Sequence, residues 1–442
     1  MSNLRAAHGI FLLLLANCFA QSPPTEQPKV QLSFAKAIEI ATSPQGNTAV
    51  QLAQQSVKLA HSRYVLARAD LLPNLDGSVA EQNQTVNLRA LGLRSEPATG
   101  FLVPEAVGPF YTFDARVRLN QNIFNLSTIR RSQAAHEDIK VAQAEGANVN
   151  DQVTATVARQ YAMALRAQAD VATARANLSL AEAVRDQMVN RESVGEGTEI
   201  EVTGAKLRVS RNQQRLINAE TALTRANLDL INTLNLDWNL RLELTGALGA
   251  RMDDSLSPEQ AVDIALKSRA DFKLQQERSD SARLSYSSAK LERMPSLVGY
   301  ADYGDLSGVQ THTAGVALRV PLFDGGRMES ERTQTMTLML QERIREKEIR
   351  NRIELEVRQA LVTLASVRNQ IDVSEQAVTL AEDELGRARR RYQSGVTNSV
   401  EVIDAETQVE NARDDRVAAQ FSYTQARIDL AQAMGTIRTI DF

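Results

Sequence analysis

The chain has 442 residues, of which 43% are hydrophobic, 24% charged and only 5% aromatic, and its formal net charge is −4. This balance leaves no basic surface for nucleic acid, so we expect no nucleic-acid partner. The long segments are rich in Ala, Gln, Arg, Glu and Leu, a composition typical of long packed helices. A single cysteine excludes an internal disulfide.

The first 20 residues have the pattern of a secretory signal. A basic start is followed by an apolar run at residues 10–15 and by small residues near Ala20. The run is too short to cross a bilayer as a helix, so we expect residues 1–20 to be a signal peptide cleaved after Ala20. The alternative is a lipoprotein lipidated at Cys18. No later segment could form a transmembrane helix, so any membrane crossing must be made by strands.

Each half of the chain is predicted to begin with a short helix and a longer second helix. Ser33 caps the first short helix, and Pro258 takes the favoured first-turn position of its counterpart. The longer helices end at Pro73 and Pro295. The expected ranges are 32–41 and about 47–71 in the first half, and 256–265 and about 271–293 in the second.

After these prolines, apolar residues alternate with polar ones, which predicts strands with one apolar face. In the first half the apolar positions are Phe113, Ala115, Val117 and Leu119; in the second they run from Ala314 to Val320. About ten residues are enough for a tilted strand to cross a bilayer. We therefore expect strand hairpins in an outer membrane at about 74–122 and 296–322. The alternative is a pair of soluble hairpins half-buried on the helices.

The first predicted hairpin is 23 residues longer than the second. The excess lies near residues 85–109, which contain three prolines and three glycines. We expect a long loop here, and long loops of membrane barrels face the outside.

A very long helix follows each hairpin, at roughly 125–192 and 325–393. Neither range contains a proline, and a helix of this length would extend about 100 Å. Apolar residues recur at alternating steps of four and three, for example from Ile353 to Tyr392, which indicates helices packed side by side with a left-handed supercoil. Each long helix then turns at a glycine and returns as a shorter helix, at about 198–235 and 398–434.

The two halves repeat one another. Gly195 and Gly395, and the residues that follow each of them as far as Leu230 and Leu430, correspond at a constant offset of 200. We infer a tandem duplication, with a first repeat at 21–250 and a second at 251–442.

This organisation predicts a mainly α fold with a transmembrane β-barrel portion. Each half contributes a β-hairpin and a long antiparallel helical hairpin. Four strands cannot close a barrel, and open strand edges are not tolerated in lipid. Several copies must therefore associate so that strands and helices both close, which gives a hollow tunnel.

These features resemble the outer-membrane efflux proteins, or TolC-like channels, over nearly the whole mature chain. The resemblance is carried by the two short-helix motifs LSFAKAIEIA and LSPEQAVDIA, the segment VPLFDGG at 320–326, and the turn RYQSGVTNSVEVIDA at 391–405. The first half departs at residues 120–125, NQNIFN, which lack the proline and paired glycines. The resemblance implies a homotrimer in outer-membrane lipid that reaches into the periplasm. It also implies a periplasmic adaptor and an inner-membrane pump as partners, and a passive tunnel for efflux or type I secretion.

By this resemblance, Glu401 and Asp404 match acidic residues that line the constriction at the periplasmic tip, and Tyr392 matches a neighbouring latch position. Rings of three carboxylates at a narrow mouth would favour cations. Each assignment has a competing interpretation except that of Asp404, whose repeat partner is Gly204. Glu401 lies where a capping box headed by Asn398 would use it. Tyr392 continues the apolar seam of its helix.

The two predicted tip turns are the expected adaptor contact, at Gly195, Gly395, Val396 and Thr397. The glycines serve first as left-handed residues that end the incoming helices.

No enzyme site emerges from the sequence. His61, His136 and His312 have no cysteine or histidine partner at ligand spacing, so we expect no catalytic residue, metal or cofactor. Two other classes compete with the channel. A periplasmic adaptor would carry one helical hairpin, and a structural coiled-coil envelope protein would not need the paired strand hairpins.

Overall fold

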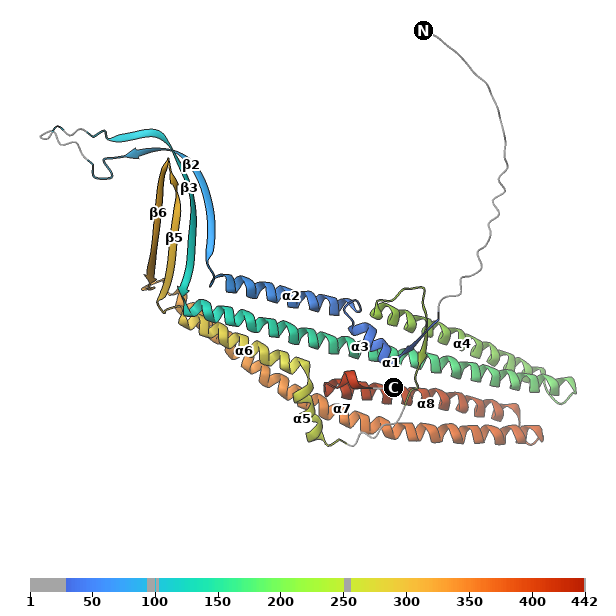
Figure 1. Cartoon of the computed structure of the whole chain (residues 1–442). Coiled ribbons are helices and arrows are strands. Elements are labelled where there is room, and N and C mark those ends of the chain that lie inside the picture. Colours follow the sequence, from blue (N-terminus) through green and yellow to red (C-terminus); the bar gives the residue numbers. More distant parts are fainter. Residues whose placement is uncertain (1–28, 94–99, 101–102, 250–255, 441–442) are drawn as a thin grey trace, which may run out of the picture.

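The computed structural model describes residues 29–93, 100, 103–249 and 256–440. The predicted signal peptide, Cys18 and the predicted repeat boundary at 250/251 lie outside these ranges. The molecule is elongated, with a β-sheet at one end and the turns of two helical hairpins at the other (Figure 1). Within the described ranges, no helix has the length and the apolar run that a bilayer crossing would need.

The four-stranded sheet is antiparallel, in the order β2-β3-β5-β6. Its strands are β2 (Asn74–Asn87), β3 (Ala106–Phe124), β5 (Ser296–Leu306) and β6 (Val309–Arg319). Both predicted hairpins are therefore present, and β3 pairs with β5 to join them. The outer edges of β2 and β6 have no partner strand in the described chain.

The first hairpin differs from its prediction in where its extra length lies. Strand β2 continues to Asn87 and β3 already begins at Ala106, and Asn87 pairs with Ala106. Part of the range 85–109 is thus strand and not loop. The sequence missed this because Gly108 and Pro109 favour a turn, yet both lie inside β3.

The sheet has one apolar and one polar face, as strand alternation requires. On the polar face the Arg116 guanidinium lies 2.6 Å from the Asp114 carboxylate and 3.8 Å from that of Asp302. The opposite face is apolar and exposed in this single chain. It carries Leu75, Val79, Tyr111, Phe113, Val117, Leu119, Tyr303, Val316 and Leu318.

The four helices next to the sheet lie side by side. Helix α2 (Thr48–Ala69) packs on α3 (Leu126–Ser193), α3 packs on α6 (Ala270–Leu291), and α6 packs on α7 (Arg327–Gln393). Farther from the sheet, α4 (Glu199–Leu234) takes the place of α2 beside α3, and α8 (Ser399–Ala433) lies between α3 and α7. The helices thus form one wall, in the order α2-α3-α6-α7 next to the sheet and α4-α3-α8-α7 towards the tips (Figure 1).

The predicted long helices are confirmed at 68 residues for α3 and 67 for α7. Their heptad seams are buried as expected, with Ile353, Val357 and Leu364 in one core cluster of α7 and Leu385 and Tyr392 in another nearer the turns. The second cluster contains residues of all four tip-side helices, so it joins the two helical hairpins.

The short helices are also confirmed, and their caps are those predicted. Helix α1 (Phe34–Thr42) is capped by Ser33, whose hydroxyl accepts from the backbone of Lys36 at 3.3 Å. Helix α5 (Pro258–Ser268) begins at Pro258 behind a capping box of Ser257 and Gln260. Both helices pack against the middle of the long helices, α1 on α3 and α5 on α7.

One pair of strands was not predicted. Strand β1 (Lys29–Ser33) pairs in parallel with β4 (Arg241–Thr245), which follows the first helical hairpin. The buried Tyr161 fixes this pair to α3, because its hydroxyl donates to the Leu32 carbonyl at 2.9 Å and also contacts the Thr245 carbonyl. Five-residue strands with a partner more than 200 residues away leave little local signal.

Candidate functional site at the tips of the helical hairpins

The candidate site lies where the two helical hairpins turn, at the end of the molecule farthest from the sheet (Figure 1). Gly195 ends α3 with φ = +81°, and Gly395 ends α7 with φ = +73°. The Gly195 amide donates to the Glu192 carbonyl at 2.9 Å, and the Gly395 amide donates to the Tyr392 carbonyl at 3.1 Å. These are the left-handed helix stops that the sequence predicts.

The turn at Gly395 gives a direct prediction about stability. A Cβ at Gly395 would meet no atom within 4 Å, so Gly395→Ala introduces only the strain of a positive φ. We expect it to destabilise the turn by about 1 kcal/mol, which makes amide exchange at residues 393–399 about fivefold faster. Gly204, in open space inside α4, is the matched control. There the same change to alanine should slow exchange, because alanine favours a helix.

Several apolar side chains beside the two turns are exposed at the tips. Val396 is 69% exposed. Val194, Ile200 and Val400 flank the two turns and are also exposed. Thr397, next to Val396, is half-buried, and its hydroxyl donates to the Glu401 carboxylate. The two tips together therefore present valine and isoleucine side chains to solvent.

Glu401 does not form the predicted capping box. Asn398 caps α8 through the backbone amide of Val400 at 3.2 Å, whereas the Glu401 carboxylate lies 2.8 Å from the Arg391 guanidinium and accepts from Thr397. The box forms only at the other tip, between Thr198 and Glu201. Asn398 fails to complete a box because its amide side chain bonds two residues ahead, in an Asx turn, and leaves Glu401 free for the arginine.

Asp404 lies one helical turn beyond Glu401 and is exposed. It forms no ion pair or hydrogen bond with any residue in the described part of the chain. Its carboxylate therefore faces solvent from the single chain, close to the Glu401–Arg391 pair.

Tyr392 is buried in the single chain, with 4% of its surface exposed. The Arg191 guanidinium lies 4.4 Å from the centre of its ring and donates to its carbonyl at 2.6 Å. Its hydroxyl donates to the Met188 sulfur at 3.1 Å. Because Arg191 and Met188 belong to α3 and Tyr392 to α7, this contact joins the first helical hairpin to the second.

Glu201 adds a polar contact between the two tips. Burial opposes its ionisation, but hydrogen bonds from Thr198 and from the Ser399 hydroxyl, with the charge of Arg191, lower its pKa overall. A carboxylate at the start of α4 thus interacts with the first residue of α8. Burial, with the nearby charge of Glu201, raises the pKa of Tyr392, which stays protonated.

A buried charge network was missed by the sequence analysis, which assigned most helix carboxylates to the wet face. Glu406 is fully buried, and its carboxylate lies 3.2 Å from the Arg208 side chain of α4 and 3.8 Å from that of Arg389 on α7. Glu410, one turn along α8, accepts from Arg208 at 3.3 Å and from Arg215 at 2.9 Å. A usable signal was present, since Glu406 and Glu410 flank the buried stripe formed by Val402, Ala405, Val409 and Ala412.

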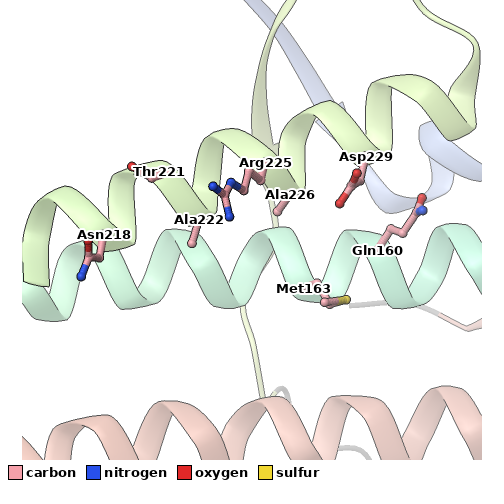
Figure 2. A pocket seen from close by; sticks show the side chains of 8 residues that line it. All are labelled: Gln160, Met163, Asn218, Thr221, Ala222, Arg225, Ala226 and Asp229. Atoms are coloured by element: carbon pink, nitrogen blue, oxygen red, sulfur yellow. The ribbon is translucent and has the colours of Figure 1, made fainter.

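The described part of the chain also has grooves away from the tips, and one of them is lined mainly by uncharged side chains. Figure 2 shows one of about 430 Å³ between α3 and α4, where Met163 and three apolar or small residues accompany Arg225 and Asp229. Over the described ranges, no group of three histidine, cysteine or acidic side chains is placed to hold a metal ion. The geometry that stands out is therefore the tip, with its exposed carboxylates and its contacts between hairpins.

Comparison with known proteins identifies the family. The family model described as "Outer membrane efflux protein" matches residues 41–236 and again residues 261–436. The chain belongs to the outer membrane efflux protein family. It is thus an outer-membrane efflux channel protein whose helices extend into the periplasm, which decides against the adaptor and coiled-coil scaffold alternatives.

Individual relatives share the family at low identity. The pyoverdine export outer membrane protein OpmQ of Pseudomonas putida is 24% identical over 413 residues, covering 90% of this chain and 84% of that protein. The proteases secretion protein PrtF of Dickeya chrysanthemi is 22% identical over 261 residues, or 56% of each chain. The crystal structure of VceC from Vibrio cholerae has a TM-score of 0.75 at 21% identity, over 91% of this chain and 96% of that one. The likeness to VceC shows the fold.

Proposed function

We propose that three copies of this efflux protein form one duct through the outer membrane and the periplasm. The observation that carries this proposal is the sheet, in which the described part of the chain leaves the edges of β2 and β6 unpaired and one face apolar and exposed. Unpaired strand edges are unstable in lipid, so β6 of one copy would pair with β2 of the next until twelve strands close a barrel.

The helices support the same assembly. Each chain supplies a wall of side-by-side helices, four next to the sheet and four towards the tips, and three such walls would close a twelve-helix tunnel below the barrel. The duplicated organisation of the chain, divided near 250/251, supplies two strand hairpins and two helical hairpins per copy. The polar face of the sheet would then face the water-filled lumen.

We place the gate of the tunnel at the tips. Asp404 is exposed and without an ion pair among the described residues, and Glu401 lies beside it, so three copies would form rings of carboxylates at the mouth. Tyr392 would act as a latch, because its contact with Arg191 and Met188 joins the hairpins whose separation would widen the mouth.

The partners would be a periplasmic adaptor and an inner-membrane pump. The adaptor would dock on the tip turns, at Gly195, Gly395, Val396 and Thr397, where apolar side chains are exposed around the two glycine turns. Relatives at similar identity are named for pyoverdine export and for protease secretion. Such different cargoes on one architecture favour a passive duct whose cargo is chosen by the pump.

Single-channel recording tests this function. Purified protein from the outer-membrane fraction is added to a planar lipid bilayer with KCl on both sides. We expect discrete, small, cation-preferring steps, because the mouth is narrow and acidic. Folded protein in the outer-membrane fraction that gives no steps would contradict the duct.

A further inference from the structure

Glu406 is fully buried, yet its carboxylate has no hydrogen bond to any residue that the structure describes. Neither of its oxygens has a hydrogen-bond partner in the described chain, and the Arg208 Nε and Arg389 Nη2 atoms that face it are also unsatisfied. The two guanidinium groups lie within 3.8 Å but not in hydrogen-bonding orientation. Burying an ionised carboxylate without hydrogen bonds is costly, and a proton removes that cost.

The carboxylate of Glu410, in the same network, accepts several hydrogen bonds. It accepts from Arg208, from Arg215 and from the Asn212 amide at 3.1 Å. Besides Glu410, Arg208 donates to the Ile403 carbonyl at 3.1 Å and to Thr407 at 2.8 Å. Its Nη1 and Nη2 atoms therefore bond to partners other than Glu406. The charge of Glu410 opposes a second negative charge at Glu406.

Glu406 also lies between the two helical hairpins. Arg208 belongs to α4 of the first hairpin, Arg389 to α7 and Glu406 to α8 of the second. Around them lies the core cluster that joins the two hairpins near the tips. Separation of the hairpins would expose Glu406 to water, where its carboxylate ionises freely.

We propose that Glu406 is a proton-binding site between the two hairpins, and that a proton on it holds the tip closed. This switch rests on the proposed tip gate and goes beyond it, because it gives the gate a signal. Protonation removes the cost of burying the carboxylate, and ionisation drives the hairpins apart towards water.

The direction of the pH dependence follows from linkage. Burial, reinforced by Glu410 and opposed by Arg208 and Arg389, raises the pKa of Glu406 from 4.5 to about 7 in the packed state. A proton therefore binds the packed state more tightly than the separated state, in which the pKa is near 4.5. The stabilisation of the closed tip is complete below pH 4.5, is lost as pH rises towards 7, and changes no further at higher pH.

Cysteine accessibility measures this separation. Ser399→Cys places a thiol of similar size at a buried position against Glu201 of the other tip, and Ile200→Cys places one at an exposed position. Each full-length variant is purified in detergent and labelled with a water-soluble maleimide. The tip peptide is read by mass spectrometry, so that Cys18 does not contribute. The ratio of the two rates cancels the pH dependence of the thiol reaction.

We expect this ratio to rise at least tenfold between pH 5 and pH 7.5 and then level off. With Glu406→Gln, which mimics the protonated form, the ratio should stay low at every pH. Glu384→Gln removes an exposed carboxylate of α7 that has no ion pair in the described chain, and it should follow the wild-type curve.

A labelling ratio that does not change with pH when Glu406 is present, or a pH response that is unchanged by Glu406→Gln, would overturn the switch. The wild-type profile alone decides the matter if Glu406→Gln fails to fold. The labelling ratio needs no ion conduction, so the two proposals fail separately. A ratio that does not change with pH, in a protein that conducts, would overturn the switch and leave the duct standing. A ratio that changes with pH, in a protein that does not conduct, would overturn the duct and leave the switch standing.

Discussion

The Glu401→Ala, Asp404→Ala double variant should conduct at least about twice as much current per channel as the wild type. In a trimer the change removes six carboxylates from the mouth, and it also releases Arg391 and Thr397, the partners of Glu401 at the turn. Fewer fixed negative charges should also weaken the preference for cations. Single-channel conductance and reversal potential in a KCl gradient measure both effects.

Asp383→Ala, Glu384→Ala is the matched control. These two carboxylates are also exposed, on α7, and lie farther from the turn. The control should keep the wild-type step size and selectivity. Equal step sizes in the wild type and the Glu401, Asp404 variant would leave a duct but place its constriction elsewhere.

Val316→Arg should nearly abolish assembly in the outer membrane. Val316 is 61% exposed on the apolar face of β6, which we propose faces lipid. An arginine facing the bilayer centre costs about 2–4 kcal/mol, and a trimer would bear that cost three times. The amount of folded protein in the outer-membrane fraction, judged by resistance to SDS at room temperature, measures the effect.

Thr313→Arg tests whether the face of the strand decides the outcome. Thr313 is on the same strand but on the polar face, where it pairs in register with Asp302. An arginine there would be solvated in the lumen beside an aspartate, so we expect nearly normal assembly. Equal loss in both variants would mean that β6 does not separate lipid from water.

Much of the fold could be predicted because its signals are local and repeated. The long helices are free of proline, their apolar seam keeps one period from Ile353 to Tyr392, and Gly195 and Gly395 mark their ends. The second strand of each hairpin has an equally plain alternation, whereas the first strands, at about 74–84 and 296–304, are less regular. The β1–β4 pair was not predicted, since its register is fixed by the buried Tyr161 and not by the sequence of either strand.

The candidate site was predictable only in part. The turn motif led to Glu401 and Asp404, but the partners of Glu401 depend on whether the cap bonds two or three residues ahead, which is decided by the geometry of Asn398. The burial of Glu406 was missed because it depends on arginines of two other helices. Such contacts between distant segments appear only once the helices are packed.

Native mass spectrometry of the purified outer-membrane protein tests whether three copies close one barrel. The wild-type protein is released from detergent micelles in the spectrometer, and its mass is compared with that of the single mature chain. We expect a particle of three chains that persists at dilutions where weak complexes separate. A folded particle of one chain, with the edges of β2 and β6 unpaired, would rule out this assembly.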